Sequence, residues 1–277
     1  MSRSTAIVLV PVVAALAAGC ANASTQKQNQ APVLRYVGSS TIAHFVRDAE
    51  PVYGRARFVL DTEPESVGGE TAIREGRADV AGYAGNPHPE TLEMGIVATL
   101  IGKDAIAVVV NRANSVRDVT RVQLEGVFTG KIRNWKELGG LDREIRPFIV
   151  GPESATRKVF RSAILGEMDY AGCEEVRPDA AVLTRVEREP GAIGQISFSF
   201  LGIKGSVKAL SVGGQNPEPT NVDYPITRPL YLLWWSGRSR VADFVSWTGT
   251  PEAEKILLRR FAKAQQVGLE APGETSE

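Results

Sequence analysis

Short apolar runs alternate with helical patterns along most of the chain, and this alternation predicts the secondary structure. The predicted strands cover residues 33–37, 56–60, 96–110, 145–150, 207–212 and 230–235. Several of these runs are rich in β-branched residues and too apolar for half-exposed strands, so we expect them to be buried on both faces. Strands separated by helices are typical of an α/β architecture with mainly parallel sheets.

The last helix has the clearest start signal in the sequence. Thr250 is a favourable N-cap residue, and Pro251 and Glu252 follow it in the first turn. We expect the apolar stripe of this helix to contain Ile256, Leu257, Phe261 and Ala264. The tail from Pro272 is predicted to be frayed.

The N-terminus has the pattern of an export signal. Arg3 precedes an apolar stretch over residues 6–16, and small residues lead into Cys20. The stretch is too short to span a bilayer comfortably, which favours a removable signal over residues 1–19. The segment resembles the bacterial lipobox, in which the cysteine takes a diacylglycerol and becomes the new N-terminus. The alternative is an ordinary cleaved signal, and in either case the mature chain leaves the cytoplasm.

The rest of the composition indicates an exported two-lobed protein. Residues 20–32 are polar and predict a disordered tether behind the lipidated cysteine. The chain has 277 residues, and 43% of them are hydrophobic. This length exceeds what a single hydrophobic core usually accommodates, so the sequence predicts two lobes. Its 32 basic residues balance 32 acidic residues, so nucleic-acid binding is disfavoured. If Cys20 carries lipid, Cys173 has no partner for an intramolecular disulfide and is interpreted as a packing residue.

Three turns rich in Ser and Thr join predicted strands to predicted helices. They contain Ser40 and Thr41, then Ser66, and then Ser154, Ala155 and Thr156. The first N–H groups of a helix lack helical partners and the macrodipole favours negative charge, so such turns can hold an oxyanion. For any one turn, plain helix capping is the better explanation of the residues. Three together predict an anion site.

Enzyme and metal chemistry have little support in the sequence. The two histidines, His44 and His88, stand in neither a metal-binding nor a nucleophile motif, so we expect no enzyme activity, no cofactor and no metal. His44 lies one turn after Thr41 and either faces the site or is a half-exposed helical residue. His88 lies between two prolines and is interpreted as a loop residue.

One segment is highly specific. Residues 126–140, GVFTGKIRNWKELGG, closely resemble the "IFTGKITNWxEVGG" segment of the phosphate-binding proteins of phosphate ABC transporters, which have the type II fold of the periplasmic binding protein superfamily. Further ordered similarities to this family, from residue 37 to about 262, occur at residues 38–41, 72–81, 103–111, 154–160, 190–194 and 224–231.

The resemblance implies two lobes that close over one anion in a central cleft. It places lobe 1 at residues 33–110 with 224–266 and lobe 2 at residues 111–223. Ser40, Thr41 and Ser66 would supply donors from lobe 1, and Ser154, Ala155 and Thr156 from lobe 2. Arg157 would either aid binding or make a surface ion pair. The implied function is that of a monomeric lipoprotein that captures phosphate, or a similar tetrahedral oxyanion, and delivers it to an ABC permease in the cytoplasmic membrane.

The chain departs from the family at the cleft. Ala84 and Gly85 stand where the family has a Ser with a charged partner, Val150 replaces an arginine, and Ala155 replaces a glycine. A charge-assisted hydrogen bond contributes about 1.5 to 3 kcal/mol, so each such loss lowers affinity by about one to two powers of ten. The departures support an alternative function, in which a divergent, ligand-poor domain acts as a sensor or scaffold at the cell envelope.

Overall fold

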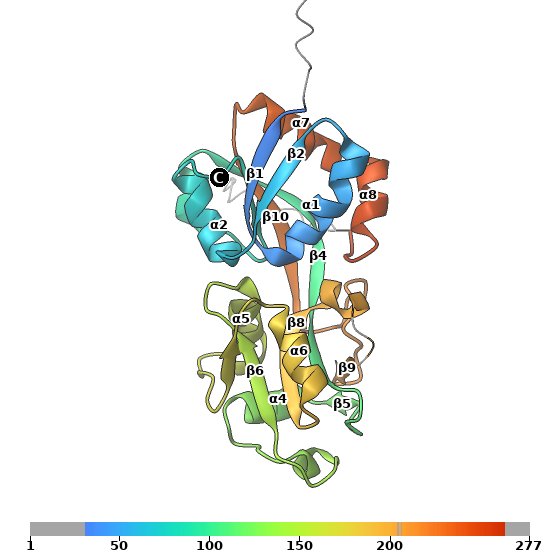
Figure 1. The fold of residues 1–277 in the computed structure, drawn as a ribbon. Coiled ribbons are helices and arrows are strands. Elements are labelled where there is room, and N and C mark those ends of the chain that lie inside the picture. Colours follow the sequence, from blue (N-terminus) through green and yellow to red (C-terminus); the bar gives the residue numbers. More distant parts are fainter. Residues whose placement is uncertain (1–30, 204, 206, 264–277) are drawn as a thin grey trace, which may run out of the picture. The chain divides into compact units, whose positions relative to one another are not determined.

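The computed structural model describes residues 31–203, 205 and 207–263. The predicted export signal, Cys20, most of the predicted tether, Ala264 and the predicted frayed tail lie outside these residues. Among the described helices, none is both long and apolar enough to cross a membrane. Figure 1 shows two groups of elements, which we call the first and the second lobe.

The first lobe is a sheet with helices on both faces. Its elements are β1 (Val33–Gly38), α1 (Ser40–Tyr53), β2 (Arg57–Asp61), α2 (Glu65–Arg74), β3 (Val80–Tyr83), α3 (Pro89–Glu93), the first part of β4 (Ile96–Asn111), β10 (Thr227–Trp235), α7 (Ser239–Thr248) and α8 (Pro251–Leu257). The strand order is β2-β1-β3-β10-β4. β1 pairs in parallel with β2 and β3, whereas β10 is antiparallel to β3 and β4.

The second lobe repeats this layered arrangement. Its elements are the end of β4, β5 (Asp118–Val119), α4 (Arg121–Phe128), the 3₁₀ turn η1 (Trp135–Leu138), β6 (Arg146–Val150), α5 (Ala155–Phe160), the π-helical turn η2 (Arg161–Leu165), β7 (Glu174–Val176), α6 (Ala181–Arg188), β8 (Ala192–Ser197), the 3₁₀ turn η3 (Phe198–Ile203) and β9 (Val207–Val212). β6 pairs in parallel with β7 and β8. β4 is antiparallel to β8 and β9.

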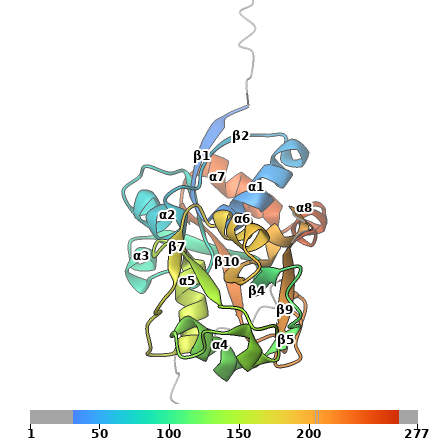
Figure 2. The ribbon, with the colours of Figure 1, turned by 60° about the horizontal axis from the view of Figure 1, so that its bottom comes forward.

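Alternation along the strands explains the two layers of each lobe. Tyr36 on β1 packs under α1, α7 and α8, and the next residue, Val37, packs under α2 on the other face. In the second lobe, Val108 and Val109 on β4 divide in the same way between the cores beneath α4 and α6. Figure 2, in which the bottom of the Figure 1 view comes forward, shows α4 from that side.

The predicted strands all form, but not every one is buried on both faces. The end of β4 is buried at every position from Asp104 to Val110, as expected. β2, by contrast, alternates between exposed and half-buried residues, and Val59 is 59% exposed. β2 lies at the edge of the sheet, where β1 is its one partner among the described strands, and this explains its exposure.

The final helix starts where it is predicted and ends earlier. The Thr250 side chain accepts a hydrogen bond from the Ala253 N–H, and α8 then stops at Leu257. Phe261 is still buried, but it lies in the turn that follows. After the helix, the backbone of Ala262 pairs with that of Lys103, with both N···O distances at 2.9 Å.

The chain passes between the lobes along β4 and returns just ahead of β10. β4 pairs with β10 up to Ala105 and with β8 from Ile106 onward. The returning segment lies beside it, because the Tyr224 hydroxyl donates to the Ile106 carbonyl at 2.8 Å and the Ile106 N–H donates to the Ile226 carbonyl at 2.8 Å. The two connections therefore form one narrow waist of paired backbone.

Gly69 on α2 allows this helix to approach β1 closely. A Cβ at Gly69 would lie 2.6 Å from Gly38 Cα and 2.8 Å from the Val37 carbonyl oxygen, both backbone atoms. We predict that Gly69→Ala lowers the free energy of unfolding by about 1–3 kcal/mol, because this overpacking outweighs the gain in helix propensity of about 1 kcal/mol.

Urea denaturation measures this effect. The control is Gly202→Ala, where an added Cβ meets no atom within 4 Å. Equal stability of the two variants would contradict the proposed close contact.

Candidate functional site

The start of α1 carries the first predicted donors. Ser39 caps the helix, because its Oγ accepts the Ile42 N–H at 3.4 Å. The N–H of Ser40 has no helical partner and donates instead to Glu65 Oε2 at 3.1 Å. Thr41 is only 2% exposed. This turn therefore presents an amide and a hydroxyl inside the protein.

The start of α2 brings the next donor to the same place. Ser66 is 1% exposed, and its Oγ accepts the Ala84 N–H at 3.2 Å. Since the oxygen accepts, the hydroxyl hydrogen is left to donate to another group. The N–H of the following residue, Val67, donates to the Glu153 carbonyl at 3.2 Å. α2 is thereby joined directly to the second lobe.

The start of α5 supplies the predicted second-lobe donors. Ser154 caps this helix by accepting the Thr156 N–H at 3.3 Å, and its hydroxyl donates to Asp179 Oδ2 at 2.6 Å. Ala155 and Thr156 are 3% and 1% exposed. All three residues predicted for this lobe are thus buried at one helix start.

Arg228 links the turns of the two lobes. Its Nη2 donates to Thr41 Oγ1 and its Nη1 to Thr156 Oγ1, each at 3.0 Å. Nε and Nη2 also donate to Asp104 Oδ2, at 3.0 and 2.9 Å. A longer contact of 3.5 Å from Nη1 reaches the Ala84 carbonyl. These contacts use all five N–H groups of the guanidinium.

Arg228 also fixes the direction in which the two threonine hydroxyls can donate a hydrogen bond. Each hydroxyl oxygen accepts from Arg228, so each hydroxyl hydrogen points to another acceptor. A captured oxyanion is such an acceptor. The arginine therefore orients one hydroxyl donor in each lobe.

Asp104 holds Arg228 in this position. The ion pair is almost completely buried, with side-chain exposures of 2% and 0%. Burial raises the pKa of Asp104, and the positive charge of Arg228 opposes this shift. Because an isolated buried charge is costly, the pair is stable only while both partners remain. Asp104 thus cancels the charge of Arg228 and fixes the plane of its guanidinium.

Two further carboxyl groups lie at the site, one from each lobe. Glu65 is 6% and Asp179 is 4% exposed. Burial, together with the charge of Asp179, raises the pKa of Glu65 to about 8. Burial raises the pKa of Asp179 to about 6, against the hydrogen bond from Ser154 and the charge of Arg228. Glu65 Oε1 is buried and has no hydrogen-bond partner among the described residues, which marks unused bonding capacity between the two lobes.

Sequence reasoning did not assign four of these residues to the site. Arg228 and Asp104 both lie in segments that resemble the family, but their pairing spans 124 residues and no local pattern reveals it. Glu65 immediately precedes Ser66 in a turn that the sequence had already identified. A carboxylate next to a predicted donor could have been included in the predicted site. Asp179 lies in a loop after Pro178 and gave no signal.

The positions that depart from the family have clear places in the structure. Ala84 uses its backbone, donating to Ser66 and accepting from Arg228. Val150 is fully buried in the core beneath α6. Neither position brings a polar side chain to the site. The arginine that contacts both lobes is Arg228, from a different strand.

Arg157 makes the surface ion pair that was one of its two predicted roles. Its Nη1 lies 2.7 Å from Glu175 Oε2, and its guanidinium lies over the Tyr170 ring. Cys173 packs half-buried against the core beneath α4, as predicted, and burial raises the pKa of its thiol to about 11.

His44 is a half-buried helical residue that contacts the second lobe. Its ring packs edge-on against Phe200 with centroids 4.6 Å apart. Burial, together with the nearby charge of Arg260, lowers its pKa to about 4. Arg260 also joins the lobes, since it bonds both Asp48 Oδ2 and the Ser199 carbonyl at 3.1 Å. His88 lies in the loop before α3 and pairs with Glu70.

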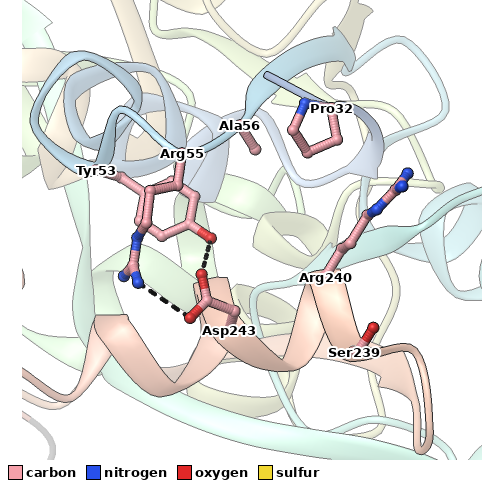
Figure 3. Close-up of a pocket in the computed structure, with 7 residues that line it drawn as sticks. All are labelled: Pro32, Tyr53, Arg55, Ala56, Ser239, Arg240 and Asp243. Atoms are coloured by element: carbon pink, nitrogen blue, oxygen red, sulfur yellow. Dashed lines mark hydrogen bonds and ion pairs between the residues drawn. The ribbon is translucent and has the colours of Figure 1, made fainter. Parts of the chain in front are cut away.

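A pocket outside the cleft lies between the end of α1 and the start of α7. It is lined by Pro32, Tyr53, Arg55, Ala56, Ser239, Arg240 and Asp243. Figure 3 shows the Tyr53 hydroxyl and Arg55 both directed at the Asp243 carboxylate, at 2.6 and 3.1 Å. The pocket contains none of the predicted ligand residues. Within the described part of the chain, no group of three His, Cys, Asp or Glu side chains is arranged to hold a metal ion.

Comparison with known sequences places this site in a family. A family model described as a PBP (periplasmic binding protein) superfamily domain matches residues 21–252. Phosphate-binding protein PstS of Bacillus subtilis (strain 168) is 31% identical over 244 residues, which cover 79% of this chain and 80% of that protein. Protein SphX of Synechococcus elongatus is 32% identical over 146 residues, covering 47% of this chain and 43% of that protein.

Solved structures share the fold. A Clostridium perfringens protein, solved with bound phosphate and described as a phosphate ABC transporter substrate-binding protein, has a TM-score of 0.77 at 24% identity and covers 84% of this chain and 100% of its own. An ABC-type phosphate transport receptor from Vibrio cholerae has a TM-score of 0.67 at 24% identity, covering 83% of this chain and 100% of its own. The chain therefore belongs to the periplasmic binding protein superfamily and, within it, to the family of phosphate-binding proteins.

Proposed function

We propose that this protein captures phosphate, or a similar tetrahedral oxyanion, outside the cytoplasm and delivers it to an ABC transporter. The observation that carries the proposal is the convergence of donors from both lobes around Arg228, which contacts Thr41 in one lobe and Thr156 in the other. The names of its relatives point to the same ligand. The family consists of transporter binding proteins, which are not enzymes.

The proposed ligand donors are those of the three helix starts. They are Ser40, Thr41, Ser66, Ser154, Ala155 and Thr156. A tetrahedral oxyanion presents acceptors in all directions, so it suits backbone N–H groups and hydroxyls that come from two sides. Helix N-termini favour negative charge without a free cation, which fits an arginine whose donors are all engaged.

Capture and delivery require the lobes to open and close. We propose residues 33–110 with 224–266 as one moving body and residues 111–223 as the other. Closure over the anion would link occupancy to docking on the permease. The paired segments near Ile106 and Tyr224 would be the hinge, because there the chain connects the lobes.

We further propose that Cys20 carries a lipid that anchors the mature protein to the outer face of a membrane, with residues 20–32 as a tether. The supporting observation is the lipobox-like sequence ahead of Cys20. The protein is proposed to act as a monomer, in which one chain supplies both sides of the cleft.

Direct titration tests the function. A form that begins at Ser24 is unfolded, freed of carried-over ligand and refolded, and then titrated calorimetrically with phosphate, with sulfate, arsenate and molybdate as competitors. Micromolar or tighter phosphate binding supports the proposal. A response to another of these anions reassigns the ligand. Silence toward all four supports the sensor or scaffold function, which Ala84 and the buried Val150 favour by leaving two cleft positions without polar side chains.

A charge placed at the second-lobe helix start tests the ligand residues. Thr156→Asp puts a carboxylate where the anion is expected, so we predict at least about a 100-fold loss of phosphate affinity with the fold intact. The matched control is Thr120→Asp, at the exposed N-cap of α4, where Asp is an equally good cap. Unchanged affinity in Thr156→Asp, measured by calorimetry with circular dichroism as the fold check, would exclude this turn.

The buried ion pair gives a separate prediction for stability. Asp104→Asn leaves Arg228 as an unpaired charge, so the free energy of unfolding should fall by about 3–5 kcal/mol. The double variant Arg228→Met, Asp104→Leu removes both charges and should lose less than Asp104→Asn alone. Urea denaturation of the single and double variants measures both effects. If the losses simply add, the two side chains are not coupled as the contacts indicate.

A further inference from the structure

In the structure described here, carboxyl groups of the protein itself occupy donors proposed for the anion. Glu65 Oε2 accepts the Ser40 N–H at 3.1 Å. Asp179 Oδ2 accepts the Ser154 hydroxyl at 2.6 Å. One donor set in each lobe is therefore held by an internal acid.

The backbone of Glu65 marks it as more than a capping residue. Its φ is 50°, the one positive value outside glycine within the described residues. A side chain at this φ strains the chain, and strain of this kind persists where the surroundings hold it. The carboxyl group is also buried with Oε1 unpartnered. A residue that is strained, buried and half-satisfied has bonding capacity that a ligand can use.

The charges around Glu65 disfavour a bound anion unless Glu65 and Asp179 are protonated. The groups that face Glu65 or Asp179 are Tyr36 on β1, Arg228 on β10, and Glu153 in the loop before α5. Arg228 is neutralised by Asp104, and Glu153 pairs with Arg177. With both acids ionised, an arriving oxyanion would meet two uncompensated negative charges in a buried cleft.

We propose that Glu65 and Asp179 form a proton gate in the cleft: in their protonated form they are neutral groups that admit the oxyanion, and in their ionised form they hold its donors and exclude it. This inference rests on the proposed function, because it concerns the same cleft. Oxyanion binding is then accompanied by proton uptake on the protein. Affinity falls as the pH rises through the titration of the two acids.

Glu65 and Asp179 titrate near neutral pH, where a change in their protonation would change anion affinity. Burial raises the pKa of Glu65 to about 8 and that of Asp179 to about 6. Below pH 6 both groups are mainly protonated, and above pH 8 both are mainly ionised. The pH dependence contributed by Glu65 should therefore appear between about pH 7 and 9.

Glu65→Gln tests the gate, because glutamine imitates the protonated carboxyl at all pH values. Phosphate affinity is measured by calorimetry at pH 6, 7.5 and 9 for the wild type, Glu65→Gln and the control Glu63→Gln, an exposed glutamate two residues earlier. We expect Glu65→Gln to match the wild type at pH 6 and to bind on the order of tenfold more tightly at pH 9. The ionisation of phosphate itself is the same for every variant and cancels in the ratio.

The number of protons taken up on binding gives a second readout. Titration at pH 7.5 in buffers with different ionisation enthalpies should show an uptake that is lower in Glu65→Gln than in the wild type, with Glu63→Gln unchanged. Asp179→Asn should act in the same direction at lower pH, from about pH 5 to 7. Weaker binding by Glu65→Gln at every pH would overturn the gate, because the carboxylate would then be an acceptor for the ligand.

The stability of the empty protein separates this inference from the proposed function. A carboxyl whose pKa is raised on folding costs stability progressively from its unfolded pKa up to its folded pKa, and the full cost remains above that. The Tm of Glu65→Gln should therefore rise relative to the wild type between about pH 4.5 and 8. If neither the wild type nor any variant binds phosphate but this Tm difference is present, the proposed function fails while the buried acid is confirmed. A Tm difference that stays constant across this pH range overturns the gate itself.

Discussion

The buried ion pair between Arg228 and Asp104 is the interaction on which the site depends. It lies on β10 and β4, the two strands that lead into the connections between the lobes. The Arg228 N–H groups that do not bond Asp104 include donors to Thr41 in the first lobe and to Thr156 in the second. Because a buried arginine must keep its partners, the same pair that stabilises the waist of the protein also sets the direction in which both hydroxyls donate.

This arrangement compensates for the polar and charged side chains that are missing at Ala84, Gly85 and Val150. The family resemblance leads one to expect a Ser with a charged partner at Ala84 and Gly85 and an arginine at Val150, yet here Ala84 contributes its backbone and Val150 contributes only packing. In the proposed function, neutral donors from helix starts carry recognition. The consequence is a site with no excess positive charge, in which the protonation of Glu65 and Asp179 decides whether an anion is tolerated.

Much of the fold was predictable because it follows local patterns. The strands have apolar runs of the right length, and the Thr250 cap marks the start of α8. The seryl turns could also be located, since Ser39 and Ser154 are N-cap residues at strand-to-helix junctions. The exposure of β2 was not predictable, because it follows from the position of that strand at the edge of the sheet.

The electrostatics of the site lay beyond local patterns. Arg228 and Asp104 are 124 residues apart in sequence, and their pairing appears only when the two lobe connections lie side by side. Asp179 meets the α5 start only in the folded lobe, where Ser154 donates to it. Ionisable residues were visible in the sequence, but their burial was not, and burial is what raises their pKa values.

A crystal structure of the protein grown with phosphate tests the central claim most directly. We predict that phosphate binds between the starts of α1, α2 and α5, that it takes over the Ser40 N–H and the Ser154 hydroxyl from Glu65 and Asp179, and that Arg228 remains paired with Asp104. Phosphate bound away from these turns, or a cleft that leaves both carboxyl groups on their present donors in saturating phosphate, would contradict it.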